Sequence, residues 1–385
     1  MENSAALSTK KDYRVPFGTV SITDEAVKLI NKALESKWVT RGKYVQEFEE
    51  EFAALFGAKF AVAVSSGTDA DAIACATLYD EGAQRGDEVI VPALTFVATA
   101  NAVVQAGFRP VFVDVDRNTL NMNPDAIEAV ITPKTRAIMP VHLMGKPAAM
   151  DRIMDIARRH YLTVIEDAAE AHGAELNGKK IGTIGAMAAF SLYAAHIVTT
   201  IEGGIILTNS PKLAEAMQSL RNHGMVNKFE FSRIGFSAKM NEIEAAVGLG
   251  NIAIFEDILG KRRRNLLYLI DLFQEFDEYF ITLREEDHEK IGPHAFSIIL
   301  REKLPFTKES FVEFLDQEGV DSRNLFYSIP TQCPSYQFLG HKLGDFPEAK
   351  YCADNGTHIG IHQDIELNQL DYVAEVVKKF LKQNL

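Results

Sequence analysis

One stretch of the sequence combines groups that could do chemistry with a backbone that cannot be regular. Residues 190–208 read FSLYAAHIVTTIEGGIILT, so Ser191 and His196 lie between two short apolar runs of β type. Gly203 and Gly204 break the strand pattern, which indicates a loop held between two strands. Because an imidazole titrates near neutral pH, His196 is predicted to move protons at a pocket.

A second stretch has the residue types of a phosphate-binding turn. The apolar run 60–64 leads into Ser65, Ser66, Gly67 and Thr68, and a helical pattern follows at 69–79. The first N–H groups of a helix lack internal partners, and the helix dipole favours an anion there. A tight turn with an N-cap explains the same residues, so the local sequence leaves both interpretations open.

Acidic and aromatic side chains follow two further apolar runs. Asp167 and Glu170 come after the run 162–165, and Phe96 comes after the run 88–91. Open α/β sheets bind ligands at the carboxyl ends of their strands, which makes Asp167 a candidate ligand group. Glu170 shares its face if a helical turn follows. The alternative interpretations are a solvated acid for Glu170 and a core aromatic for Phe96.

The elements that must position these residues alternate between strands and helices. This β-α-β rhythm predicts an α/β domain with a parallel or mixed sheet, followed by a smaller α+β domain. Helices are expected at 22–36, 45–56, 69–79, 151–160, 211–222, 308–318 and 371–382, and strands at 60–64, 88–91, 110–115, 137–141, 162–165, 279–282 and 295–300. A long helical segment at 242–273, interrupted near Gly260, is also expected.

Composition argues against several functional classes. The 385 residues include 47% hydrophobic and 24% charged side chains, and their formal net charge of −13 argues against nucleic-acid binding. Apolar runs fall short of membrane-spanning length, and the N-terminus lacks the core of a signal peptide, so we expect a cytoplasmic protein without membrane contact. Three scattered cysteines predict neither a disulfide framework nor a zinc ribbon, and no metal site is expected.

The motifs together resemble the DegT/DnrJ/EryC1/StrS sugar aminotransferases, which are fold type I pyridoxal-phosphate enzymes. Their cofactor segment runs S-F-x-x-x-K-x-x-x-T-x-E-G-G, and this chain matches it at Ser191, Thr200, Glu202, Gly203 and Gly204. The resemblance implies a large cofactor-binding domain at 13–250 with a mostly parallel seven-stranded sheet. It also implies a small C-terminal domain at 251–385 and a loose tail at 1–12.

The resemblance also implies roles for the candidate residues toward pyridoxal or pyridoxamine phosphate. The phosphate would be held at Gly67 and Thr68, and Ser191 would also bind the cofactor. Phe96 would stack on the pyridine ring, and Asp167 would pair with its nitrogen and keep it protonated. Glu170 would contact the cofactor ring or the substrate.

Further residues bear on partners and on the substrate. Ser237 stands where the family has an Asn that reaches the cofactor phosphate of the neighbouring subunit, which implies a homodimer with shared active sites. The basic run 261–264 is interpreted as a solvated helix face, with proximity to a diphosphate as the alternative. His362, in an extended segment, has either a structural role or a place at the active site.

The chain departs from the family motif at its central residue, because His196 stands where the Lys that binds the cofactor belongs. An imidazole cannot form an imine with an aldehyde. The same replacement is typical of the family's sugar 3-dehydratases. The resemblance to that branch implies pyridoxamine phosphate as the working cofactor, a nucleotide-linked 4-keto-6-deoxy hexose as substrate, and His196 as the base while the 3-hydroxyl leaves.

Three cysteines are too few for an iron–sulfur cluster, so the dehydratase type that regenerates its cofactor from L-glutamate fits better. Two alternatives stay open. One is a sugar aminotransferase that tolerates His196, for which Lys179 and Lys180, interpreted as turn residues, are the nearest upstream lysines. The other is a non-catalytic relative that binds sugar nucleotides.

Overall fold

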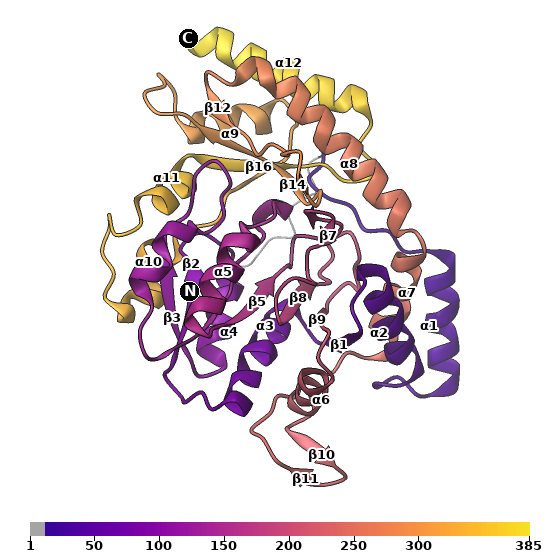
Figure 1. Cartoon of the computed structure of the whole chain (residues 1–385). Helices are drawn as coiled ribbons and strands as arrows, with labels where there is room; N and C mark the ends of the chain where they lie inside the picture. The colour runs from indigo at the N-terminus through magenta and orange to yellow at the C-terminus, as the bar shows by residue number, and fades with distance from the viewer. Residues whose placement is uncertain (1–11) are drawn as a thin grey trace, which may run out of the picture.

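The computed structural model describes residues 12–385 and contains a seven-stranded sheet at its centre (Figure 1). In spatial order its strands are β1 (Phe60–Val64), β9 (Gly204–Thr208), β8 (Met187–Ser191), β5 (Thr163–Asp167), β4 (Thr135–Ile138), β2 (Glu88–Pro92) and β3 (Arg109–Val113). Only β9 runs antiparallel to its neighbours in this sheet. The predicted α/β class with a mostly parallel seven-stranded sheet is confirmed.

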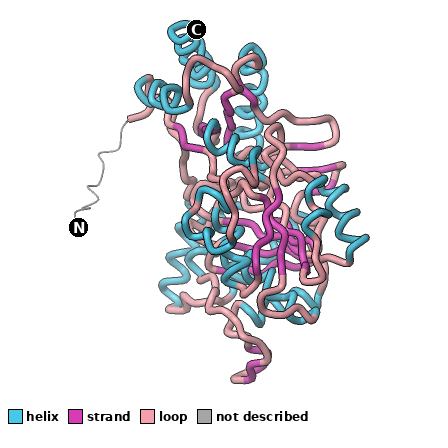
Figure 2. The backbone as a smooth tube through the Cα atoms, turned by 90° about the vertical axis from the view of Figure 1, so that its left-hand side faces the viewer, coloured by secondary structure: helices cyan, strands magenta, loops and turns pink. Residues whose placement is uncertain are grey.

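Helices cover both faces of this sheet (Figure 2), and the strand sequences show why. Val89 and Val91 of β2 join the hydrophobic core on one face, whereas Ile90 between them joins the core on the other face. Side chains alternate across a pleated strand, so a strand covered on both faces is apolar throughout. The covering helices are α2 (Lys43–Phe56), α3 (Gly67–Ala76), α4 (Val97–Gln105), α5 (Met150–His160) and α6 (Pro211–Leu220).

A smaller antiparallel sheet lies above the first in Figure 1. Its order is β12 (Phe280–Ile281), β14 (Ala295–Leu300), β16 (Gly356–Gly360) and β15 (Ser322–Asn324), with α8 (Phe255–Leu272), α9 (Lys308–Gln317), α11 (Pro347–Asn355) and α12 (Leu367–Asn384) around it. The chain also contributes here before the large sheet begins, because Val15 pairs with Val320. Of the predicted tail at 1–12, all but residue 12 lies outside the described residues.

The interruption predicted near Gly260 is in the wrong place. The long helical segment divides at Ile254, between α7 (Glu242–Ala253) and α8, while Gly260 lies inside α8 in open space. Ile254 leaves the helical region, with φ −114° and ψ 12°. Neither Gly nor Pro marks this residue, which is why the sequence pattern does not predict the break there; Ile254 packs against one of the two hydrophobic cores.

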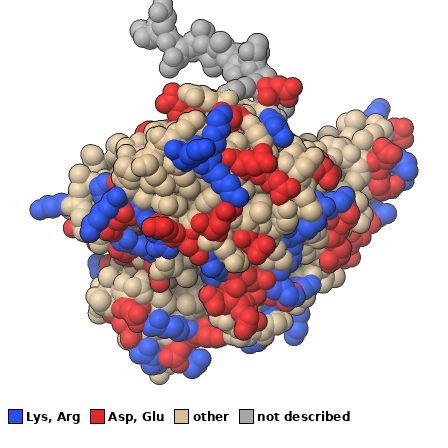
Figure 3. Space-filling view, turned by 90° about the horizontal axis from the view of Figure 1, so that it is seen from above, with Lys and Arg blue, Asp and Glu red and all other residues tan. Residues whose placement is uncertain are grey.

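Smaller elements complete the fold. The hairpin of β10 (Met225–Asn227) and β11 (Glu230–Phe231) projects from the base of the molecule (Figures 1 and 2). Lys179 and Lys180 form β7, an exposed strand beside β6 (Glu175–Leu176), and are not the turn residues that the sequence predicts. Within residues 12–385 no helix is long and apolar enough to span a bilayer. Acidic and basic side chains are interspersed over the face seen in Figure 3.

Candidate active site

The loop that carries His196 joins β8 to β9 and is closed by hydrogen bonds at its neck. The Leu192 N–H donates to the Gly203 carbonyl at 2.9 Å, and the Leu192 carbonyl accepts from Thr200 N–H at 2.9 Å and Thr199 Oγ1 at 2.8 Å. Ile201 has a φ of 75°, which a β-branched residue rarely adopts. These contacts define the conformation of the loop, with strain at Ile201.

Two close backbone approaches join this loop to the predicted phosphate turn. A Cβ at Gly67 would lie 2.8 Å from Ser191 Cβ, and a Cβ at Gly204 would lie 2.2 Å from the Ser66 carbonyl oxygen. Both positions therefore require glycine. Ser66 caps α3 by accepting from Asp69 N–H at 3.0 Å, while the N–H groups of Gly67 and Thr68 have no acceptor within the helix. The result is a helix end beside Ser191 with N–H groups available to an anion.

Asp167 ends β5 at the carboxyl edge of the sheet, and its side chain is buried. Thr99 Oγ1 donates to Oδ2 at 2.7 Å, and Ala169 N–H donates to Oδ1 at 3.2 Å. Burial raises the pKa of Asp167, and these two hydrogen bonds oppose the rise. A cation placed against this carboxylate would be strongly bound, which is the property that a pyridinium partner needs.

Asp71, on α3, is a second buried acid that the sequence analysis missed. Its side chain is 2% exposed, and Oδ1 has no hydrogen-bond partner. Burial raises the pKa of Asp71 well above its ordinary value, and the nearby charge of Asp167 raises it further. An acid inside the apolar run from Ala70 to Ala76 was the signal that could have marked it.

His196 lies in a row of three imidazoles contributed by separate segments. Its ring centroid is 5.6 Å from that of His172 and 5.1 Å from that of His294, and its Nδ1 is buried without a partner. Burial lowers the pKa of His196 well below 6.5, and the charges of His294, His172 and Arg262 lower it further. His196 is thus a neutral imidazole with a free nitrogen, as a proton acceptor requires.

His172 ties this loop to the segment after β5. Its Nε2 lies 3.0 Å from the Ser191 carbonyl and its Nδ1 lies 3.3 Å from Val198 N, so it bonds the backbone on both sides of His196. These partners assign Nε2 as the donor and Nδ1 as the acceptor. Burial lowers the pKa of His172 to about 3, which keeps the ring neutral in this role.

Glu170 and His294 meet at the other end of the row. His294 Nε2 lies 3.4 Å from Glu170 Oε1, and Met144 N–H donates to Oε2 at 2.6 Å. Burial raises the pKa of Glu170 to about 7. Glu170 is therefore not the solvated acid of the alternative interpretation. Nothing in the local sequence around His294 links it to His196, and the sequence analysis missed it.

The basic run 261–264 is not a solvated face throughout. Arg262 is buried, donating from Nε to Gln363 Oε1 at 2.9 Å and from Nη1 to the Ala195 carbonyl at 3.3 Å. Burial lowers the pKa of Arg262 to about 10. Arg263 pairs with Glu285, and Lys261 remains exposed beside Asp257. Arg262 thus holds the backbone of the loop one residue before His196.

Three predicted residues lie at the margins of this cluster. Phe96 precedes α4 and is 56% exposed, so a face of its ring is free to receive a ligand. Ser237 is exposed, although the next residue accepts a hydrogen bond from Ser65 N–H at the phosphate turn. His362 is buried just after β16, and its carbonyl accepts a hydrogen bond from Asn265 Nδ2. The structure brings Gly67, Ser191, His196 and Glu170 into one region.

Comparison with known proteins places this region in a family. A profile of the DegT/DnrJ/EryC1/StrS aminotransferase family matches residues 20–378. The chain belongs to this family. Its members among known proteins include both aminotransferases and dehydratases of nucleotide sugars. The family predicted from the sequence is confirmed.

Three members of the DegT/DnrJ/EryC1/StrS family show the range of this similarity. GDP-perosamine synthase of Caulobacter vibrioides, an aminotransferase, is 36% identical over 91% of this chain and 94% of its own length. GDP-4-keto-6-deoxy-D-mannose 3-dehydratase of Escherichia coli O55:H7 is 31% identical over 94% of this chain and 99% of its own. The E. coli dehydratase structure with bound hydrated PLP superposes with a TM-score of 0.86 at 29% identity, covering 94% and 99% of the two chains.

Proposed function

We propose that this protein is a coenzyme B6-dependent 3-dehydratase of a nucleotide-linked 4-keto-6-deoxy hexose, with pyridoxamine phosphate regenerated from L-glutamate. The observation that carries the proposal is His196. It occupies the family's lysine position on the loop between β8 and β9, and its Nδ1 is buried without a partner. A group that cannot bind the cofactor covalently but can accept a proton suits a dehydratase better than an aminotransferase.

The residues present fit the cofactor. The amino end of α3 offers the N–H groups of Gly67 and Thr68 for a phosphate, and Ser191 stands directly against Gly67. Asp167 is a buried carboxylate suited to a protonated ring nitrogen, and the exposed ring of Phe96 is available for stacking. When bound, the cofactor supplies an amine that condenses with the 4-keto group and a ring that accepts electrons.

Side chains of this chain do the remaining work. Asp167 would hold the ring nitrogen of a bound cofactor protonated, and Thr99 orients that carboxylate through its 2.7 Å hydrogen bond. His196 takes the proton that must leave before the 3-hydroxyl can depart, and the loop contacts of His172 and Arg262 hold the imidazole in place. Overall, the sugar loses one oxygen while glutamate becomes 2-oxoglutarate and ammonia.

The second candidate is an aminotransferase, favoured by the 36% identity to GDP-perosamine synthase. It requires a lysine other than residue 196 to bind the cofactor. Lys179 and Lys180 lie on the exposed strand β7, where Lys180 Nζ donates to the Leu55 carbonyl at 2.6 Å. The buried Lys146 is engaged by Glu289 and the Arg284 carbonyl. None of these three lysines is free beside His196, which supports the dehydratase.

We also propose that the protein works as a homodimer with shared active sites. The projecting hairpin and the residues after it expose Val226, Phe229, Phe231 and Ile234, the last of them 94% exposed. Exposed apolar side chains gathered on a projecting segment are typical of a protein interface. Ser237, the residue expected to reach the partner's cofactor phosphate, follows this segment directly.

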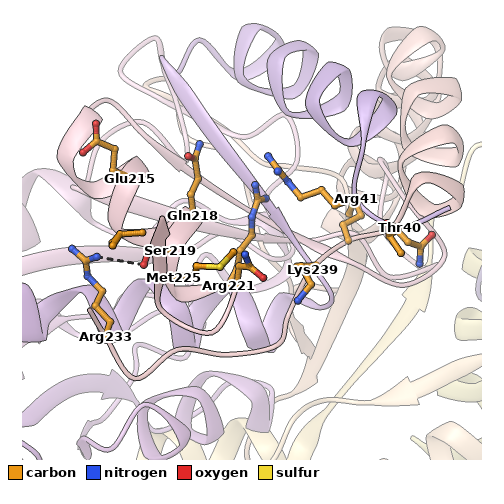
Figure 4. A pocket seen from close by; sticks show the side chains of 13 residues that line it. Thr40, Arg41, Glu215, Gln218, Ser219, Arg221, Met225, Arg233 and Lys239 are labelled. Atoms are coloured by element: carbon orange, nitrogen blue, oxygen red, sulfur yellow. Dashed lines mark hydrogen bonds between the residues drawn. The ribbon is translucent and has the colours of Figure 1, made fainter. Parts of the chain in front are cut away.

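A basic cleft of about 890 Å³ adjoins the same segment and supports this arrangement (Figure 4). Arg41, Arg221, Arg233 and Lys239 contribute to its walls, and Glu215 is its acidic member. The three arginines are already paired, Arg41 and Arg221 with Glu49 and Arg233 with Asp80. Lys239 is exposed, with Nζ 3.5 Å from Ser237 Oγ, and is available to an anionic group held by a second copy.

The test of the catalytic proposal is the mass of the product. The protein is incubated with pyridoxal phosphate, L-glutamate and GDP-4-keto-6-deoxy-mannose, and the sugar nucleotide is analysed by mass spectrometry. The proposal predicts the loss of one oxygen with formation of 2-oxoglutarate and ammonia. A 4-amino sugar would instead establish the aminotransferase. Binding without turnover, repeated with CDP- and dTDP-linked 4-keto-6-deoxy sugars, would indicate a non-catalytic relative.

A further inference from the structure

A buried acid stands at the end of the imidazole row. His172, His196 and His294 follow one another at centroid separations of 5.6 and 5.1 Å, and His294 Nε2 lies 3.4 Å from Glu170 Oε1. The side chains of His294 and Glu170 are 13% and 10% exposed. His172 uses both ring nitrogens on the backbone of the loop, so only the His294 side of the row leads to a group that can change its charge.

Protonation of His196 places a positive charge in a buried site, and ionisation of Glu170 can compensate that charge. The surroundings of His196 are buried and already hold the Arg262 guanidinium, so a second positive charge there is costly. The titratable groups around the row are Asp167 at the end of β5, Glu170 and His172 after it, Arg262 on α8, and His358 on β16. Among these, Glu170 is the acid within ion-pair distance of the row.

We propose that Glu170 and His294 form a proton-holding pair that balances the charge on His196 when His196 takes a proton, which makes His294 a positioning residue for the reaction. This inference rests on the proposed function, in which His196 is the base. As the proton arrives at His196, Glu170 releases its own proton to water and becomes a carboxylate beside His294. No covalent bond other than O–H and N–H changes, and the net charge of the site stays constant.

The charge states of the resting pair agree with this role. Burial raises the pKa of Glu170 to about 7, and burial together with Arg262 lowers that of His294 to about 3. Near neutral pH, Glu170 is therefore the member of the pair that can hold a proton, and the His294 imidazole is neutral. An acid with a pKa near neutrality can release its proton at little cost when a cation forms nearby.

One turn of backbone builds the pair. Met144 and Gly145 both have left-handed φ values, 54° and 77°. The turn directs Met144 N–H to Glu170, and the Gly145 carbonyl accepts a 2.9 Å hydrogen bond from the N–H of Gly292, two residues before His294. A Cβ at Gly145 would lie 1.9 Å from the Gly292 carbonyl oxygen, so glycine is required there. The turn after β4 thus fixes the acid and the imidazole relative to each other.

The experiment compares Glu170→Gln, His294→Gln and the double variant in the full-length protein loaded with pyridoxal phosphate. The His196 imidazole is titrated by NMR with ¹³C-labelled histidine, using His196→Asn to assign its signal. The rate at which L-glutamate converts the bound cofactor is followed by absorbance against pH. Glu170→Gln keeps an oxygen for Met144 N–H and is expected to fold. His358→Gln, which removes another buried imidazole of the smaller domain, is the matched control.

We expect His196 to titrate at lower pH in both single variants than in the unaltered protein, and the rate to fall about tenfold to a hundredfold. Because the two residues act as a unit, the double variant should be no slower than the slower single variant. An unchanged His196 titration in Glu170→Gln, or additive losses in the double variant, would overturn the inference. If the His196 titration shifts in these variants but the sugar loses no oxygen, the proposed function is refuted, whereas the inferred coupling of Glu170 and His294 to His196 still holds.

Discussion

Glu166 and Asp167 are consecutive buried acids on β5, yet their surroundings differ completely. Glu166 accepts from the N–H groups of Gly182, Ile184 and Gly185 at 2.7 to 3.0 Å and lies 3.2 Å from His142 Nε2. Asp167, on the other face, has two donors and a second buried acid, Asp71, nearby. The carboxylate of Glu166 is therefore fully hydrogen-bonded within the protein. The carboxylate of Asp167 remains available to a positively charged ligand.

The pKa directions express this difference. Burial alone would raise the pKa of Glu166, but His142 and the backbone N–H donors lower it below its ordinary value. Burial raises the pKa of Asp167, and its hydrogen bonds do not reverse that rise. A buried acid with a structural role therefore has enough hydrogen-bond donors around its carboxylate to stabilise the charge. A buried acid that binds a ligand has too few donors within the protein.

The largest expected effect comes from Asp167→Asn. Without the carboxylate, the ring nitrogen of the cofactor loses its anionic partner, and we expect turnover to fall about a thousandfold. The free energy of unfolding of the cofactor-free protein should not decrease, because a buried charge is removed. Steady-state turnover and urea unfolding check the two halves of this prediction. Near-normal turnover would show that Asp167 is not the cofactor's partner.

Glu166→Ala should instead lower the stability of the protein and leave its affinity for the cofactor almost unchanged. It leaves three backbone N–H groups and His142 without their acceptor, so we expect a loss of about 3–5 kcal/mol in the free energy of unfolding. The affinity of the folded fraction for pyridoxal phosphate should stay within a few-fold of the original. Denaturant unfolding and a cofactor titration test this. Equal stability of the variant would mean that the network around Glu166 is not structural.

Asp71→Leu should change the free energy of unfolding by less than Glu166→Ala does, and in the opposite direction. Removing an unpartnered buried acid should raise the free energy of unfolding at pH 7 by about 1–3 kcal/mol. The folded pKa of Asp71 is raised, so its penalty grows as the pH rises from the ordinary carboxylate range to that pKa, and the gain should shrink when unfolding is repeated at lower pH. Asp71→Asn, with similar shape and no charge, is the control. A destabilised Leu variant would contradict this interpretation.

Local sequence predicted those parts of the site that lie on continuous motifs. The strand, turn and helix around Gly67, the acid at the end of β5 and the loop of His196 each fall within one continuous stretch of sequence, where spacing determines geometry. Arg262 on α8 and His294 before β14 lie far from the loop in sequence and meet it only through tertiary packing, for which a single sequence carries no local signal. The break at Ile254 was missed for the same reason.

The central claim is that residue 196 occupies the position that binds the cofactor covalently in the family, and that His196 leaves this chain without a covalent link. The most direct measurement is the intact mass of the protein after incubation with pyridoxal phosphate and reduction with borohydride, followed by peptide mapping. We predict no added pyridoxyl group on the unaltered protein and one group at position 196 of His196→Lys. A pyridoxyl group on any lysine of the unaltered protein, or none at position 196 of the variant, would contradict the claim.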